Sequence, residues 1–376
     1  MRTRAAILTQ MGATAPYAVS KPLAIEEIEL APPGPGEVLV RMRAAGLCHS
    51  DLSVIDGNRP RPMPMVLGHE GAGVVEALGD GVRDFAVGDH VVTAFVPSCG
   101  QCAPCAGGRP ALCEPGATSN TAGTLLSGER RLQNAAGKPL NHHLGVSAFA
   151  EFAVVASESL VKVARDLPFD EAAVFGCAVM TGVGAVINTA ALPLERSVAV
   201  VGLGGVGLAA LLGARVQQSA VLIAIDLSAA KLALATELGA THVFNAADPD
   251  CAAQVREATR GGVEYAFEMA GSVKAMALAY QITRRGGTTV TAGLSHPSAM
   301  FSIPHVGIVA EERTIKGSYL GSAVPRRDIP RYIDWYRAGR LPVDRLLSEH
   351  LALDDINGAF DRLARGESVR QVVQFA

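Results

Sequence analysis

Runs of lysine and arginine are absent from this sequence, and its 36 acidic and 33 basic side chains give a formal net charge of −3. The sequence therefore lacks the clustered basic residues that are typical of nucleic-acid-binding proteins.

A long apolar segment near the first residue is also absent, since AAIL is too short for a signal-peptide core, and we expect a cytoplasmic protein. The uncharged stretch 198–214 is slightly short for a bilayer and rich in glycine, so we expect no membrane association.

Cysteine is scarce: the chain has seven, an odd number for 376 residues, unlike the short secreted domains that disulfides hold together. Four of the seven lie in the stretch CGQCAPCAGGRPALC. Soft thiolates at such short spacing favour a closed tetrahedral zinc site. An iron–sulfur cluster is the main competitor, but its usual spacing places proline directly after the last ligand, and Pro115 comes one residue later. The predicted ligands are Cys99, Cys102, Cys105 and Cys113.

The chain has two regions with different sequence patterns, which predict an α/β protein with two domains. Up to about residue 178 it has short β-branched runs bounded by Gly, Pro and Asp, such as EVLVRMRAAG, GAGVVEALG and GDHVVTAFV, which indicate a β-rich domain. From residue 179 strands alternate with helical stretches, which predicts a doubly wound parallel sheet. The C-terminal part predicts two amphipathic helices and a final strand.

The stretch VGLGGVG gives Gly202, Gly204 and Gly207 the G-x-G-x-x-G spacing between an expected strand and an expected helix. The next expected strand, VLIAID, ends in Asp226, which can accept from both ribose hydroxyls and would repel a 2′-phosphate. The pattern therefore predicts NAD rather than NADP. A plain strand–turn–helix with Asp226 as a helix cap is the alternative. Lys231 could meet the same ribose or be an exposed helix lysine.

Three other segments hold metal-ligand residue types: GLCHSD contains Cys48, LGHEGAG contains His69, and VFGCAVMTGVGAV contains Cys177. Each alone has an ordinary explanation, because a lone cysteine is usually in the core and a lone histidine is usually just hydrogen-bonded. Together, two thiolates and one imidazole are a known ligand set for a zinc site with one open position.

Over essentially its whole length the sequence resembles the zinc-dependent medium-chain alcohol dehydrogenases, through GHEGAGVVEALG, CGQCAPCAGGRPALC and GLGGVG in that order. The resemblance implies a GroES-like catalytic domain at 1–178, an NAD-binding Rossmann domain at 179–324, and a return to the catalytic domain at 325–376. It also implies two zinc ions per chain. The segment GKPLNHHLG is similar to the longer branch of the family, which implies a homodimer.

The resemblance also assigns roles to individual residues. It places the catalytic zinc on Cys48, His69 and Cys177 with Glu70 close behind, and the structural zinc on the four clustered cysteines. Asp51 would orient His69, and Ser50 would begin a proton relay, but Ser53 stands where many relatives have the terminal histidine. The expected cofactor contacts are His49, Thr181, Gly202, Gly204, Gly205, Val206, Gly207, Asp226, Lys231 and Arg370, and the expected substrate contacts are Phe95 and Leu144.

The implied reaction is reversible hydride transfer between a primary aliphatic or aryl alcohol and NAD. One branch of the family instead oxidises S-(hydroxymethyl)glutathione through acidic residues at the channel mouth, and Arg59 and Arg61 in DGNRPRP make that activity less favoured here. Two more distant alternatives are a zinc-free quinone reductase and a zinc-ribbon interaction protein. The number of zinc ions per chain distinguishes them: two for the dehydrogenase, one for the ribbon and none for the reductase.

Overall fold

The computed structural model describes all residues, 1–376, and divides them into two compact units. The first unit contains 1–177, 324–331 and 347–376, and the second contains 178–323 and 332–346. This division shifts the two expected boundaries by one residue each, at 178 and 324. It also places residues 332–346 in the second unit, whereas the expected return to the first unit ran without a break from 325.

The first unit is rich in strands. Its strands are β1 (Arg2–Leu8), β2 (Leu23–Leu30), β3 (Glu37–Gly46), β4 (Met65–Val66), β5 (Glu70–Leu78), β6 (His90–Thr93), β7 (Leu132–Gln133), β8 (Pro139–His142), β9 (Phe152–Ala156), β10 (Leu160–Val163), β17 (Glu349–Leu351) and β18 (Gln371–Gln374). Its α-helices are α1 (Tyr17–Ser20), α2 (His49–Ile55), α3 (Ala103–Ala106), α4 (Glu114–Ala122), α5 (Phe169–Val174) and α13 (Ile356–Ala364).

The second unit alternates strands and helices. Its strands are β11 (Ser197–Val201), β12 (Val221–Asp226), β13 (His242–Asn245), β14 (Val263–Glu268), β15 (Thr283–Thr291) and β16 (Thr314–Gly317). Its α-helices are α6 (Met180–Gly184), α7 (Gly205–Val216), α8 (Ala229–Glu237), α9 (Cys251–Ala258), α10 (Val273–Ile282) and α11 (His305–Ala310), while α12 (Pro325–Arg337) has residues in both units. Short 3₁₀ turns occur at Pro110–Leu112, Ser157–Ser159, Leu320–Ser322, Val343–Leu346 and Leu353–Asp355, and π-helical turns at Phe175–Val179 and Ala185–Thr189.

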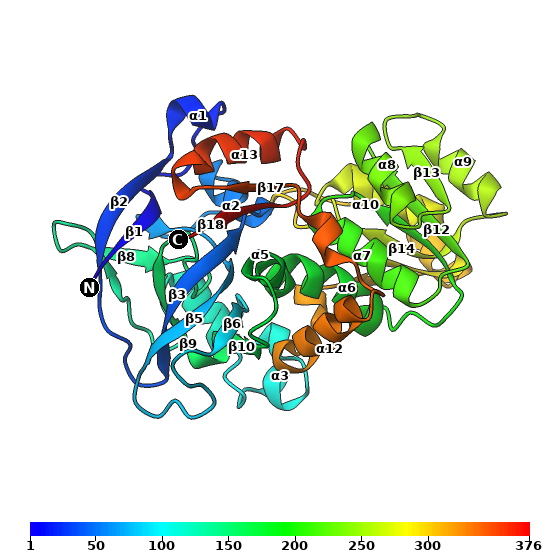
Figure 1. Cartoon of the computed structure of the whole chain (residues 1–376). Coiled ribbons are helices and arrows are strands. Elements are labelled where there is room, and N and C mark those ends of the chain that lie inside the picture. The colour runs from blue at the N-terminus through cyan, green and yellow to red at the C-terminus, as the bar shows by residue number, and fades with distance from the viewer. The chain divides into compact units, whose positions relative to one another are not determined.

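Two β-structures form the first unit. One is a closed barrel in the order β1-β2-β7-β8-β4, and the other is a sheet in the order β10-β6-β5-β3-β18-β17, with β9 also paired to β3. The last strand of the chain, β18, lies antiparallel beside β3 (Figure 1). Because β3 leads directly into helix α2, this pairing brings the C-terminal segment next to the residues that follow β3.

The second unit is a six-stranded parallel sheet in the order β13-β12-β11-β14-β15-β16. The strand order reverses between β11 and β14, which is the switch point where doubly wound sheets bind ligands. Its central strands β11 and β12 are rich in β-branched residues and largely buried, and Ile223, Ile225 and Val255 belong to one apolar cluster with Ala266 and Ile282. The predicted α/β class, with a β-rich domain and a doubly wound sheet, is confirmed.

One continuous helical segment, Phe169–Thr189, is long and apolar enough to cross a membrane by composition alone. Within it, 78% of the most apolar window is buried inside the protein, as in a core helix. In the sequence the stretch 198–214 has a similar apolar composition, and it forms most of strand β11, a turn and most of helix α7. Cys177 lies where the helix widens to π geometry, a feature frequent at functional sites.

Candidate active site

The first unit gathers Cys48, His69, Glu70 and Cys177 from separate parts of the chain. Cys48 is the N-cap of α2, His69 and Glu70 stand at the start of β5, and Cys177 lies in the π-helical turn after α5. Their ligand atoms all lie within 4.8 Å of one another, and all four residues are buried. The four were assigned to one metal site from the sequence, and the fold brings them together.

These residues fit a zinc ion by the chemistry of their unused atoms. The Nε2 atom of His69 and the Oε2 atom of Glu70 are both buried, and neither has a hydrogen-bond partner. Cys48 and Cys177 form no disulfide. Buried polar atoms without partners are costly, so a cluster of two thiols, one imidazole nitrogen and one carboxylate oxygen is satisfied best by a cation.

At Cys48 the ionisation of the cluster supports this interpretation, whereas His69 must lose its Nε2 proton to bind a metal. The hydrogen bond from Cys177 holds the pKa of Cys48 well below its usual value, while the same contact and burial raise the pKa of Cys177. Burial acts to lower the pKa of His69, but the Asp51 carboxylate prevails and raises it well above the usual value. A thiolate is therefore already favoured at Cys48, and thiolates are the form that binds zinc.

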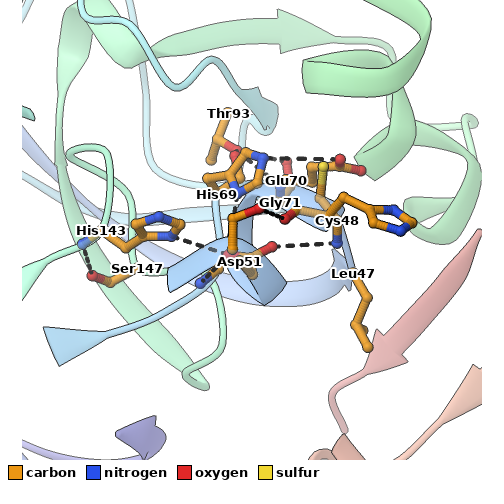
Figure 2. Close-up of polar contacts among 12 residues, drawn as sticks. Leu47, Cys48, Asp51, His69, Glu70, Gly71, Thr93, His143 and Ser147 are labelled. Carbon is orange, nitrogen blue, oxygen red and sulfur yellow. Dashed lines mark hydrogen bonds and ion pairs between the residues drawn. The ribbon is translucent and has the colours of Figure 1, made fainter. Parts of the chain in front are cut away.

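Asp51 connects the parts of this cluster (Figure 2). One oxygen, Oδ2, accepts the backbone N–H of Cys48 at 3.3 Å, and the other, Oδ1, accepts that of Gly68 at 3.1 Å and lies 3.2 Å from Nδ1 of His69. With its Nδ1 facing a carboxylate, His69 carries its proton there and presents the lone pair of Nε2 to a metal. The expected contact between Asp51 and His69 is present.

Glu70 forms a buried ion pair that was not anticipated. Nη1 of Arg370 donates to Oε1 of Glu70 at 2.8 Å and to the carbonyl of Leu47 at 2.7 Å. Burial raises the pKa of Glu70 to about 8, although the charge of Arg370 opposes the rise. Arg370, expected as a cofactor contact, therefore uses one nitrogen to hold Glu70, and this contact depends on the pairing of β18 with β3.

His143 also contacts this cluster, although the sequence did not identify it as a site residue. Its Nδ1 lies 3.0 Å from Oδ1 of Asp51, and its ring stands edge-on to that of His69 with the centroids 5.4 Å apart. The histidine pair in GKPLNHHLG was the available signal, but nothing in the sequence alone indicates that this segment folds onto Asp51.

The four clustered cysteines form a separate site on α3 and the neighbouring turns. Their sulfurs lie within 4.8 Å of one another, and Sγ of Cys102 is 4.0 Å from Sγ of Cys113, close to the roughly 3.8 Å that a tetrahedron with Zn–S bonds of about 2.3 Å requires. Backbone N–H groups of Cys99 and Gly116 donate to Sγ of Cys113, and that of Cys102 donates to Sγ of Cys99. Backbone donors lower the pKa of Cys99 to about 7, whereas burial raises the pKa of Cys113. The spacing of the four sulfurs fits zinc.

The glycine-rich turn of the second unit joins β11 to α7. Gly202 has φ +92°, and a Cβ on Gly207 would lie 1.8 Å from the carbonyl oxygen of Gly202, so both positions require glycine. Gly204 caps α7, and a side chain there would meet nothing, which leaves the helix N-terminus open to a phosphate. Gly205 and Val206 begin the helix.

Asp226 is the last residue of β12 and lies at the same turn, as expected from the G-x-G-x-x-G motif and the acidic residue that follows it. Its Oδ2 accepts the backbone N–H of Leu203 at 2.6 Å, and its Oδ1 accepts that of Ser228 at 2.9 Å. Lys231 lies in the first turn of α8, and Thr181 is buried in α6. These residues belong to the second unit, whereas His49 and Arg370 belong to the first.

The remaining predicted residues lie in the first unit. Ser50 and Ser53 are on α2 with His49, and the Ser53 hydroxyl donates to the His49 carbonyl at 2.8 Å. Phe95 packs edge-on against His69 with ring centroids 5.3 Å apart, and Leu144 is buried with a positive φ of 52°.

Comparison with known proteins identifies the family. The family profile described as alcohol dehydrogenase GroES-like domain matches residues 34–165, and the one described as zinc-binding dehydrogenase matches 205–338. The chain is 37% identical to S-(hydroxymethyl)glutathione dehydrogenase of Paracoccus denitrificans over the full length of both. The chain belongs to the zinc-containing alcohol dehydrogenase family. It is thus an NAD-dependent zinc oxidoreductase.

Solved structures of the alcohol dehydrogenase family have the same fold over the whole chain. Benzyl alcohol dehydrogenase of Acinetobacter calcoaceticus is 33% identical, with a TM-score of 0.93 and complete coverage of both chains. An alcohol dehydrogenase zinc-binding domain protein of Burkholderia ambifaria is 36% identical, with a TM-score of 0.94, covering 100% of this chain and 99% of the other. The resemblance found in the sequence is confirmed, and the names of these relatives refer to more than one substrate.

Proposed function

We propose that this enzyme converts a primary alcohol, aliphatic or aryl, to its aldehyde while reducing NAD. The observation that carries the proposal is the buried cluster of Cys48, His69 and Cys177, in which His69 Nε2 has no partner. Three protein ligands leave the fourth position of a zinc ion open, as catalytic sites require. Bound there, zinc would act as a Lewis acid on the substrate oxygen, with the nicotinamide as hydride acceptor.

The neighbouring side chains hold this ligand set in place. Asp51 fixes the tautomer of His69 and, through the backbone of Cys48, the start of α2. Glu70 adds a carboxylate beside the three ligands, and Arg370 balances its charge. In the four-cysteine cluster, Cys99, Cys102, Cys105 and Cys113 would bind the structural zinc.

We assign the start of the proton path to Ser50, which lies on α2 two residues after Cys48. Ser53, in the position of the expected terminal histidine, donates its proton to a backbone carbonyl, and a neutral hydroxyl is a poor base. His49, on the same helix, or water would then receive the proton.

We assign cofactor contacts to residues of each unit, taken separately. In the second, the turn with Gly202, Gly204 and Gly207 and the N-terminus of α7, including Gly205 and Val206, would receive the pyrophosphate, Asp226 and Lys231 would contact the ribose, and Thr181 would pack on the nicotinamide. In the first, His49 and Arg370 would contact the pyrophosphate.

An apolar substrate is supported by two buried apolar residues, Phe95 and Leu144, of which Phe95 contacts His69. An aryl alcohol would match such an aromatic and aliphatic lining. The similarity to benzyl alcohol dehydrogenase agrees with this substrate class.

S-(hydroxymethyl)glutathione is the second candidate, because the relative from Paracoccus that carries this name is 37% identical over its full length. The segment with Asp56, Arg59 and Arg61 argues against it. Both carboxylate oxygens of Asp56 already accept hydrogen bonds from Asn58, and the charged residues that follow are basic.

A substrate panel distinguishes the two candidates. Ethanol, hexanol, benzyl alcohol and formaldehyde with glutathione are each incubated with NAD, and NADH absorbance is followed. We expect benzyl alcohol and hexanol to be oxidised best, and Phe95→Ala to lower kcat/KM for benzyl alcohol more than for ethanol. Turnover confined to formaldehyde with glutathione would replace this proposal with the second candidate.

We also propose a cytoplasmic homodimer. The edge strand β16 is exposed along its length, and Met300, Val306 and Val309 nearby in sequence are 80%, 69% and 65% exposed. An unpaired edge beside exposed apolar side chains is a surface that a second copy can cover. The seven unpaired cysteines support a reducing compartment. Light scattering should give twice the 38.9 kDa chain mass, and a mass of one chain would contradict the dimer.

A further inference from the structure

The carboxylate of Asp51 is shared between two buried imidazoles. Oδ1 lies 3.2 Å from Nδ1 of His69 and 3.0 Å from Nδ1 of His143, and none of the three side chains is more than 1% exposed. Figure 2 shows the two rings approaching Asp51 from different sides. Only His69 is among the residues proposed to bind zinc, so the role of His143 is open.

The backbone around His143 is firmly anchored. Its N–H donates to the hydroxyl of Ser147 at 3.0 Å, and that hydroxyl donates to the carbonyl of Val66 at 2.8 Å. The N–H groups of Val146 and Ser147 return to the His143 carbonyl at 3.0 and 3.2 Å, and that of Ala148 donates to the Gly68 carbonyl at 3.0 Å. The turn is thus tied to the segment that leads into His69.

The short contact fixes where the proton of His143 lies. A carboxylate oxygen and an imidazole nitrogen without hydrogen would repel each other at 3.0 Å, so Nδ1 carries the hydrogen. The N–H does not point along a hydrogen-bond direction, so Nδ1 has no hydrogen-bond partner and meets Oδ1 of Asp51 as a short polar contact. The side chain of Asp51 is itself fully buried.

We propose that His143 is a positioning residue for the catalytic zinc site: its polar Nδ1 edge, 3.0 Å from Oδ1, holds the Asp51 carboxylate in the orientation that fixes His69. Oδ1 then accepts from the backbone of Gly68, faces Nδ1 of His69 and lies against His143, so the carboxylate cannot turn away from His69 without breaking contacts to two segments of the chain. This inference rests on the zinc ligands proposed above. Residues that orient a metal-bound histidine in this way typically change metal affinity by about 10–100-fold when removed.

Two substitutions distinguish the effect of the polar Nδ1 edge of His143 from the effect of its ring. His143→Phe keeps an aromatic ring against His69 but has no donor, whereas His143→Asn loses the ring but places an amide N–H near the position of Nδ1. His142→Gln is the matched control, because His142 is the neighbouring residue and equally buried, and its Nε2 accepts from the backbone of Arg131 rather than contacting Asp51.

The measurement is the rate at which each zinc ion leaves the folded holoenzyme in excess EDTA, followed as zinc remaining per chain. The phase of zinc release that is absent in Cys48→Ser is assigned to the catalytic zinc. The ligand assignment itself is tested separately by the zinc content of the wild type, which should be two ions per chain. We expect His143→Phe to release the catalytic zinc about tenfold faster, with the structural zinc unchanged, and His143→Asn and His142→Gln to stay within about twofold of wild type. Should His143→Phe fail to fold, His143→Leu takes its place.

Three results would overturn the proposal. Equal rates for His143→Phe and wild type would show that the polar Nδ1 edge has no role, and loss of zinc in His143→Asn but not His143→Phe would show that only the ring matters. A third zinc per chain that disappears in both variants would show that Asp51, His69 and His143 bind a metal of their own.

Discussion

Arg370, directly before strand β18, and Glu70, at the start of β5, form an ion pair of 2.8 Å in which neither side chain is more than 4% exposed. A buried charge without its partner is strongly destabilising, so neither residue can be removed without cost to the fold. The pair ties the residue after His69 to the last strand of the chain. The ligand cluster and the C-terminal return of the chain are therefore energetically coupled.

Glu70→Gln tests this coupling. At about pH 9, above the pKa of about 8 that burial gives Glu70, its carboxylate is charged. The amide has nearly the shape of the carboxylate but no charge, so Arg370 would be left unbalanced, and we expect the free energy of unfolding to fall by about 3–5 kcal/mol in urea titrations at that pH. Asp84→Asn, which breaks the exposed pair with Arg326, is the control and should cost less than about 1 kcal/mol. Equal effects of the two substitutions would argue against the buried pair.

Asp226 should determine the choice between NAD and NADP. Asp226→Asn removes the charge that repels a 2′-phosphate but keeps an oxygen that can accept the N–H of Leu203, so the preference for NAD should narrow by about tenfold or more. Asp226→Gly should narrow it too, with an added loss of stability because both backbone hydrogen bonds disappear. Ratios of kcat/KM for the two cofactors measure the effect, and an unmodified enzyme that uses both equally would contradict the assignment.

His142 should make stability depend on pH in mild acid. Burial lowers its pKa to about 3, whereas an unfolded histidine has a pKa of about 6.5. Between these values the unfolded chain binds more protons, so this contribution to stability is fully present above about pH 6.5 and declines as the pH falls towards 3. The slope approaches about 1.4 kcal/mol per pH unit within that range.

His142→Gln removes this titration while keeping an oxygen that can accept from the Arg131 backbone. Urea unfolding of both proteins between pH 7 and 4.5 should show the wild type losing stability faster. Parallel curves would mean that His142 does not titrate on unfolding.

The proton path should respond to an added base. Ser50→Ala should reduce alcohol oxidation severely, and Ser53→His should raise it between about pH 6 and 8, where an imidazole begins to accept protons. Ser53→Ala, which adds no base, is the control. If His49 already accepts the proton, the gain should vanish and His49→Gln should depress the rate at neutral pH. The pH dependence of the single-turnover rate distinguishes these acceptors. If neither Ser53→His nor His49→Gln changes the pH profile, water is the proton acceptor.

The sequence predicted what depends on local spacing. Cys99 to Cys113 lie within one short segment, and the glycine turn and Asp226 lie in one strand–helix–strand unit, so their arrangement follows from the local fold. Strand β3 matches EVLVRMRAAG, and α12 and α13 match the two amphipathic stretches near the C-terminus. Contacts made by long-range folding were not predicted: His143 reaches Asp51 through a distant turn, and Arg370 reaches Glu70 through the pairing of β18 with β3. Neither pairing leaves a pattern in one sequence.

Zinc content and NADH formation, measured together on the wild type, Cys48→Ser and Cys102→Ser, test the central claim most directly. The wild type should hold two zinc ions per chain and oxidise benzyl alcohol with NAD. Cys48→Ser should stay folded with one zinc and almost no turnover, while Cys102→Ser should lose the other zinc and melt at a lower temperature, because structural zinc contributes folding energy. A wild type with fewer than two zinc ions, or a Cys48→Ser protein with both ions and full turnover, would contradict a catalytic zinc at Cys48, His69 and Cys177.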